Sequence, residues 1–106
     1  MHTFELRQLL EQAEAGGHRY HEFLRVPDLS MGLYRLQAGE ADPQSPHDQD
    51  EVYYVLRGRA SIQVNGAVSA VEPGSIVYVE ARAAHKFIDI EDDLTVLVFF
   101  APAETS

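Results

Sequence analysis

The sequence contains no cysteine among its 106 residues. Disulfide bonds and zinc sites built on thiolates are therefore excluded, although this absence does not decide the cellular compartment. Basic residues are also scarce, because eight Lys and Arg stand against 17 Asp and Glu, which gives a formal net charge of −9 at pH 7. Such an acidic chain is expected to be soluble, and it is a poor partner for nucleic acid or for an anionic membrane surface.

Long apolar runs are missing as well. No stretch approaches the roughly 20 apolar residues that a membrane-spanning helix needs. The segment MHTFELRQLLEQ at the N-terminus carries a charge every few residues and lacks the apolar core of a secretion signal. The chain also has no low-complexity linker, and no phosphate loop, nucleophile elbow or Ser-His-Asp arrangement is found in it. We therefore expect one domain over residues 1–106, located in the cytoplasm.

Residues 1–17 are predicted to form an N-terminal helical segment. Apolar residues between positions 4 and 13 recur at near-helical spacing, and Gly16-Gly17 ends the pattern. Thr3 has a side chain suited to cap the first turn. The pattern predicts a short amphipathic helix that covers one end of the remaining structure.

Short strands separated by turn residues are predicted over residues 18–101, which indicates an antiparallel sandwich or barrel. The first strand ends at Pro27 and should lie at a sheet edge, because proline cannot continue a central ladder. The pair Asn65-Gly66 is a strong hairpin signal. In the strand expected at residues 31–38, the alternation leaves open whether Tyr34 or Arg35 points inward.

The last expected strand, LTVLVFFA at residues 94–101, is apolar on both faces. Both faces should therefore be covered, by the barrel interior on one side and on the other by the N-terminal segment or a second subunit. This strand, the proline-terminated arm and the small size of the domain together predict a homodimer.

A histidine and a carboxylate lie on either side of a turn in the stretch GEADPQSPHDQDEVYYVLRG, residues 39–58. His47 precedes the polar turn Asp48–Asp50, and Glu51 opens the apolar run that follows. In an extended chain the two side chains would lie roughly 13 Å apart. One ion holds its ligands about 2 Å away, so it could not reach both. A chain reversal at the turn removes this problem, and the pair then forms an incomplete metal site.

A second stretch, residues 74–89, can supply a further ligand. It again runs from glycine through a strand and a loop to a histidine, His85, at the start of another strand. If that strand continues to residue 90, alternation places His85, Phe87 and Asp89 on one face.

The first of these stretches resembles a motif of the cupin superfamily of small β-barrels. That motif is Gly-x5-His-x-His-x3/4-Glu-x6-Gly, and Gly39, Ser45, His47, Glu51 and Gly58 fall on it without a gap. Ser45 stands where the motif has its first metal-binding histidine.

The second stretch resembles the other cupin motif, Gly-x5-Pro-x-Gly-x2-His-x3-Asn. Gly74, Glu80, Arg82, His85 and Asp89 fall on its positions, although Glu80 replaces the proline, Arg82 the glycine and Asp89 the asparagine. Together the two motifs imply an all-β, single-domain cupin, which is a double-stranded β-helix or jelly-roll barrel, with a short N-terminal helix.

The resemblance and the spacing point to His47, Glu51 and His85 as ligands of one divalent ion. Two imidazoles and one carboxylate suit iron, zinc, manganese or nickel. Three protein ligands leave positions open for water or substrate, as in catalytic rather than structural sites. The alternative is a metal-free cupin pocket in which Glu51 and His85 form a buried ion pair.

Around these ligands, Ser45 and Asp89 are the candidates for a second shell. Ser45 would hydrogen-bond a ligand or a bound water, and Asp89 would orient a histidine. Tyr53 shares a strand face with Glu51 and either points its hydroxyl into the cavity or belongs to the aromatic core. Tyr53 and His85 are the candidate catalytic residues.

Three classes of function remain open. Many metal-binding cupins are dioxygenases, so the resemblance implies a metal-dependent enzyme acting on a small organic molecule. The second class is a non-catalytic small-molecule-binding or sensor module. The third is a metal-free isomerase or epimerase, in which His85 would be the general base. The substrate is not specified, because a fold hosts many functions.

Overall fold

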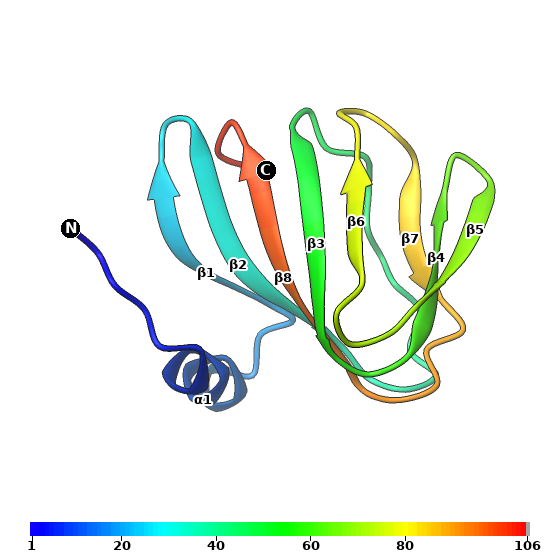
Figure 1. Cartoon of the computed structure of the whole chain (residues 1–106), viewed down its shortest axis with the longest axis horizontal. Helices are drawn as coiled ribbons and strands as arrows, with labels where there is room; N and C mark the ends of the chain where they lie inside the picture. Colours follow the sequence, from blue (N-terminus) through cyan, green and yellow to red (C-terminus); the bar gives the residue numbers. More distant parts are fainter. Residues whose placement is uncertain (106) are drawn as a thin grey trace.

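The computed structural model describes residues 1–105 and arranges them as two β-sheets with one helix outside (Figure 1). The elements are α1 Leu6–Gly16, β1 Tyr20–Val26, β2 Leu29–Leu36, β3 Asp50–Arg57, β4 Ala60–Val64, β5 Ala67–Val71, β6 Ile76–Val79, β7 His85–Ile88 and β8 Leu94–Ala101. One sheet has the order β1-β2-β8-β3-β6 and the other β5-β4-β7, with every neighbouring pair antiparallel. The predicted all-β architecture with a short N-terminal helix is confirmed.

The hydrophobic core lies between the two sheets and follows the strand alternation. Tyr53 and Val55 of β3 face the same interior as Ile62 of β4 and Phe87 of β7, and all four are at most 2% exposed. From β8, the buried side chains Val96, Val98 and Phe100 join them. Each strand therefore presents every second residue to one shared core.

Helix α1 covers part of the outer face of the larger sheet. Leu9 and Ala13 pack on Leu33 of β2, and Leu97 of β8 lies against the same group. The outer face of β8 is thus covered near Leu97 by the N-terminal segment. This segment and a second subunit were the two alternatives expected for that face. Among residues 1–105, no helix is both long and apolar enough to span a membrane.

The helix begins later than its sequence predicts. Glu5 occupies the N-cap position without a side-chain cap, so the prediction of Thr3 as the cap is wrong. Phe4 packs edge-on against Phe23 of β1, with ring centroids 5.0 Å apart. This tertiary contact accounts for the extended backbone before Leu6. The end of the helix is as predicted, because Gly17 adopts φ 67° just after Gly16.

Several local predictions for the strands are confirmed. β1 is an edge strand, and Asn65-Gly66 joins β4 to β5 with positive φ at both residues, 49° and 86°. Such a pair of left-handed residues is the geometry of a type I′ hairpin. Tyr34 points into the core, whereas Arg35 points outward and donates from Nη1 to the Ala13 carbonyl oxygen at 2.8 Å.

The ends of the strands define two rims of the molecule, an upper and a lower one. β1, β6 and β8 end, and β3 and β7 begin, at the upper rim of Figure 1. The loop before β3 and the segment after β8 lie at this same rim, so residues from both predicted motifs meet there.

Candidate metal centre

His47, Glu51 and His85 meet at the upper rim. His47 lies in the loop before β3, Glu51 is the second residue of β3 and His85 is the first residue of β7. One ligand atom from each lies within 4.8 Å of the others. The two sheets thus contribute to one cluster, as the spacing of the two motifs predicts.

Backbone contacts hold the two motif loops together. The Arg82 amide donates to the His47 carbonyl oxygen at 2.6 Å. Next to it, the Ala81 amide donates to Asp50 Oδ1 at 2.9 Å. Because these bonds join the loop before β3 to the loop before β7, His47 and His85 are kept close without any ion.

Glu51 brings a buried carboxylate to the cluster. Its residue is 2% exposed, and Oε1 lies 2.9 Å from Nε2 of His85. Apart from this ion pair, neither carboxylate oxygen has a hydrogen-bond partner within residues 1–105. A carboxylate that is removed from water needs a cation or several donors to compensate. A positive charge close to Glu51 is therefore needed to stabilise its buried carboxylate.

The hydrogen bonds of His85 define which of its nitrogens carries a proton. Nδ1 lies 2.8 Å from the Ala83 carbonyl oxygen, which can only accept, so Nδ1 is the donor. In the neutral ring, Nε2 then holds a lone pair, yet it faces Glu51 Oε1 at 2.9 Å and Gln44 Oε1 at 3.1 Å. Nε2, Glu51 Oε1 and Gln44 Oε1 would then be three acceptors in contact. This arrangement requires either a second proton on His85 or a metal ion between the three atoms.

The pKa of His85 reflects the same arrangement. Burial lowers it, but the hydrogen bonds to Glu51 and to the Ala83 carbonyl, together with the charge of Glu51, outweigh burial and raise the pKa above its ordinary value. The site thus attracts a cation, which suits divalent metals with nitrogen and oxygen ligands.

Gln44 enters the site in the place predicted for Ser45. The Ser45 side chain is exposed, whereas Gln44 points toward Tyr53 and His85. The physical reason lies in Asp42, whose Oδ2 accepts from the Phe87 amide at 2.8 Å and draws its side of the extended segment inward. Residues two apart on extended backbone share a side, so Gln44 follows Asp42. The polar pair Asp42-x-Gln44 is a signal in the sequence that could have indicated this orientation.

Asp89 does not reach the cluster either. β7 ends at Ile88, and Asp89 adopts φ 50° with an exposed side chain. The left-handed residue breaks the alternation, so Ile90 turns into the core while Asp89 faces solvent. The expected grouping of His85, Phe87 and Asp89 on one face therefore holds only for the first two.

Tyr53 satisfies both alternatives left open by its sequence position. Its ring is 1% exposed and packs on Phe87 with centroids 4.9 Å apart. Its hydroxyl donates to Gln44 Oε1 at 2.7 Å. Burial, with the nearby Glu51 charge, raises the pKa of Tyr53 well above its ordinary value. The hydroxyl therefore stays protonated and serves as a donor at the edge of the site.

The segment after β8 folds back across the upper rim. The Ala103 amide donates to the Pro27 carbonyl at 3.2 Å, and the Glu104 amide donates to Oγ of the buried Ser30 at 2.9 Å. Arg25 Nη2 donates to the Glu104 carbonyl oxygen at 2.7 Å. These three bonds fix the backbone of Glu104 without using its side chain.

That side chain points at His47. Glu104 Oε2 lies 3.9 Å from Nδ1 of His47, whose ring packs edge-on against Phe100 with centroids 5.0 Å apart. Burial raises the pKa of Glu104, although His47 opposes this rise. Metal-binding histidines usually have a carboxylate or carbonyl at their second nitrogen. Glu104 faces Nδ1 of His47, but at 3.9 Å the two are farther apart than a hydrogen bond. No sequence motif marked Glu104.

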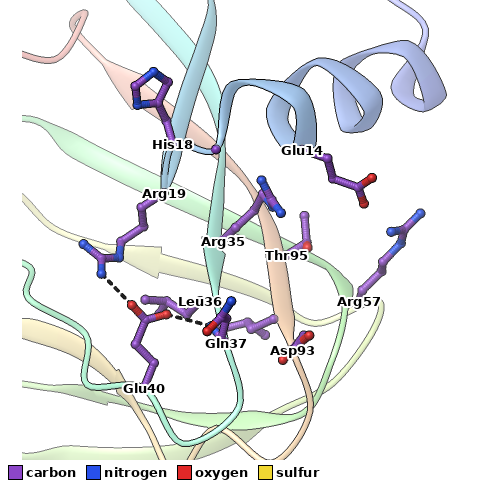
Figure 2. Close-up of a pocket in the computed structure, with 12 residues that line it drawn as sticks. Glu14, His18, Arg19, Arg35, Leu36, Gln37, Glu40, Arg57, Asp93 and Thr95 are labelled. Carbon is purple, nitrogen blue, oxygen red and sulfur yellow. Dashed lines mark hydrogen bonds and ion pairs between the residues drawn. The ribbon is translucent and has the colours of Figure 1, made fainter.

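Two cavities show where small molecules can approach. One of about 380 Å³ borders the centre and is lined by Gln44, Pro46, Gln63, Gly66, Ala84, His85 and Lys86. A larger cavity of about 630 Å³ lies at the lower rim beside α1 (Figure 2). Its lining includes three arginines and three acids, and the ion pair between Arg19 and Glu40 lies along it. The lining arginines and acids therefore balance in formal charge.

Comparison with known proteins identifies the family. The model of the cupin domain matches residues 32–101, a span that contains all three residues of the cluster. The chain belongs to the cupin family. This cupin is 49% identical to an uncharacterised protein of Streptomyces coelicolor over 105 residues, which cover 99% of this chain and 100% of the relative.

Solved structures agree with this fold. TT1209 from Thermus thermophilus superposes with a TM-score of 0.75 at 25% identity, over 97% of this cupin and 99% of that chain. An RmlC-like cupin from Shewanella frigidimarina superposes with a TM-score of 0.72 at 18% identity, over 79% and 75%.

Proposed function

We propose that this cupin binds one divalent metal ion through His47, Glu51 and His85 and uses it to act on a small organic molecule. The observation that carries the proposal is the position of His85 Nε2, which faces Glu51 Oε1 and Gln44 Oε1 while Nδ1 is used by the Ala83 carbonyl oxygen. A metal ion satisfies all of these atoms at once, and it also compensates the carboxylate of Glu51.

We favour oxygen-dependent chemistry of the dioxygenase type. Two imidazoles and one carboxylate are the ligands of non-haem iron(II) sites, where the bound ion supplies open positions for oxygen and substrate. Zinc, manganese and nickel suit the same ligands. Around this centre, Tyr53 offers a protonated hydroxyl, while Phe87 and Phe100 give the site apolar walls that limit the entry of water.

The second candidate is a metal-free pocket in which His85 carries a second proton. The 2.9 Å contact between His85 and Glu51, and the raised pKa of His85, support this alternative too. Such a protein would be an isomerase, an epimerase or a non-catalytic binding or sensor module. A doubly protonated His85 is no general base, so an isomerase would need the neutral form.

Elemental analysis of the purified protein separates these candidates. We expect about one divalent ion per chain in the wild type after reconstitution, and loss of that ion in His47→Ala and His85→Ala with the circular dichroism unchanged. His18→Ala is the matched control, because His18 lines the cavity at the opposite rim. Undiminished metal content in both site variants, or a wild type that takes up no metal, would refute the proposal.

Oxygen uptake then distinguishes catalysis from binding. Iron(II)-loaded protein is mixed with a panel of small organic acids, sugars and phenols, and oxygen consumption is recorded with an electrode. Consumption that depends on both substrate and His85 supports dioxygenase chemistry. A ligand that shifts the melting temperature but consumes no oxygen supports the binding or sensor function instead.

We also propose that this cupin forms a homodimer through the uncovered part of the larger sheet. Outward-facing residues form two neighbouring rows across β8, β3 and β6, because Val52 pairs with Phe99 and Tyr78, and Tyr54 pairs with Ile76. Tyr54, Ile76 and Tyr78 are 40%, 72% and 62% exposed. Contiguous apolar surface of this kind marks interaction sites, and a two-fold axis would cover it on both copies.

A further inference from the structure

The amide of Gln44 is held in one orientation by its neighbours. Its Nε2 donates to Asp42 Oδ2 at 2.6 Å, and its Oε1 accepts from the Tyr53 hydroxyl at 2.7 Å. Turning the amide over would place its oxygen against the Asp42 carboxylate, where no proton is available. Asp42 is itself anchored by the Phe87 amide and the Tyr34 hydroxyl. The oxygen of Gln44 therefore points toward the cluster.

The position of this oxygen fits that of a ligand. Gln44 Oε1 lies 3.1 Å from His85 Nε2, and the same nitrogen lies 2.9 Å from Glu51 Oε1. Two ligands at right angles, each about 2.1 Å from an ion, are about 3.0 Å apart. Both separations match this spacing, so Gln44 and Glu51 are related to His85 in the same way.

The carbonyl oxygen of Gln44 can also accept a second interaction. An amide carbonyl oxygen has two lone pairs, and the Tyr53 hydroxyl occupies one of them. The second lone pair is directed toward Nε2 of His85 at 3.1 Å, so an ion bound to Nε2 could also be reached by this oxygen.

We propose that Gln44 is a fourth protein ligand of the ion and replaces the nitrogen that Ser45 cannot supply. This inference rests on the proposed metal-binding function. The ligand set becomes two imidazole nitrogens from His47 and His85, and two oxygens from Glu51 and Gln44. Amide and carboxylate oxygens suit manganese and iron(II) better than copper. A six-coordinate ion would keep two positions for exchangeable molecules instead of three.

Titration with Mn²⁺ tests the proposal on the purified, metal-free protein. Gln44→Leu keeps most of the side-chain volume but removes the oxygen, and we expect Kd for Mn²⁺ to rise about tenfold or more, since losing even an outer partner costs that much. Ser45→Ala is the matched control and should leave Kd unchanged, because Ser45 is exposed. Gln44→His restores a ligand and should bind at least as tightly as Gln44→Leu.

A second measurement separates a ligand from a merely positioning residue. Water-proton relaxation reports how many waters Mn²⁺ holds, and Gln44→Leu should add one, because water takes the vacated position. Tyr53→Phe removes the hydrogen bond to Gln44 but not the oxygen, so the water count should stay at the wild-type value.

The outcomes distinguish the two proposals. If the wild type binds no Mn²⁺, the proposed function fails and this inference fails with it. If the wild type binds Mn²⁺ and His85→Ala abolishes binding, but Gln44→Leu changes neither Kd nor the water count, only the fourth ligand is refuted. A Gln44→Leu variant that weakens Mn²⁺ binding without adding a bound water also overturns the ligand role, because no coordination position would then have been vacated.

Discussion

Replacing Glu104 by alanine removes a carboxylate from the edge of the proposed metal centre while leaving the segment that carries it in place. The amide and carbonyl of Glu104 bond to Ser30 and Arg25 through the backbone, at 2.9 and 2.7 Å. Glu104→Ala keeps both bonds. The variant therefore isolates the contribution of one side chain to the orientation of His47.

The size of the effect follows from the distance and the exposure of the pair. Glu104 Oε2 lies 3.9 Å from His47 Nδ1, and the two side chains are 20% and 21% exposed. Unit charges about 4 Å apart interact by about 1 kcal/mol in water and about 4 kcal/mol at the edge of a protein, and these values bound the effect from above, because a ligating His47 is neutral and carries only part of the charge of the ion. Partners of metal-binding histidines contribute about 10–100-fold to affinity, or about 1.4–2.8 kcal/mol, which lies between these limits. We expect a loss of that size for Mn²⁺ in Glu104→Ala.

Isothermal titration calorimetry with Mn²⁺ measures this loss directly. Glu104→Gln keeps an acceptor oxygen without the charge and should lie between the wild type and Glu104→Ala. Glu91→Ala, at an exposed position, removes one negative charge elsewhere and corrects for the overall field of the acidic chain. If Glu104→Ala binds Mn²⁺ as tightly as Glu91→Ala does, Glu104 does not support His47 and the reasoning is wrong.

Three further predictions concern stability, assembly and catalysis. Gly58→Ala should lower the free energy of unfolding in urea by about 1–3 kcal/mol, because φ is 92° and a Cβ would lie 2.4 Å from the Asp93 carbonyl oxygen; wild-type stability would contradict this close approach. Ile76→Lys with Tyr78→Lys should reduce the mass in light scattering from that of a dimer to 11.9 kDa, and a wild type already at that mass would disprove the dimer. Tyr53→Phe should bind Mn²⁺ normally but consume oxygen more slowly once a substrate is known, whereas an unchanged kcat would remove Tyr53 from the catalytic candidates.

Local chemistry made most of the fold predictable. Asn65-Gly66 needs left-handed backbone at both residues, and Pro27 excludes a central strand, so hairpin and edge could be located from a few residues. Thr3 failed as a helix cap because a distant side chain, Phe23, holds the following residue, Phe4. Such tertiary contacts override local propensity, and the sequence of the helix alone does not contain them.

The candidate site likewise contains some residues that could be predicted from the sequence and others that could not. His47, Glu51 and His85 were predictable because they fall on the ligand positions of the two cupin motifs, and the fold brings them to one rim. Gln44 was not, since its inward orientation depends on the bond between Asp42 and the backbone of Phe87 in another strand. Motif spacing alone places Ser45, the residue after Gln44, at the ligand position. Glu104 depends on the folding back of a whole segment, which no local pattern reports.

The place of β8 has a consequence for how the protein is made. β8 is the last of the eight strands to be synthesised, yet it lies between β2 and β3 in the larger sheet (Figure 1). Until residues 94–101 leave the ribosome, the edges of β2 and β3 that pair with β8 stay open to other chains. Before β8 is added, Glu51 on β3 is paired on one side only, with Val79 of β6. Assembly of the proposed metal centre therefore follows the synthesis of β8, and nascent chains that stall before β8 should aggregate or require a chaperone.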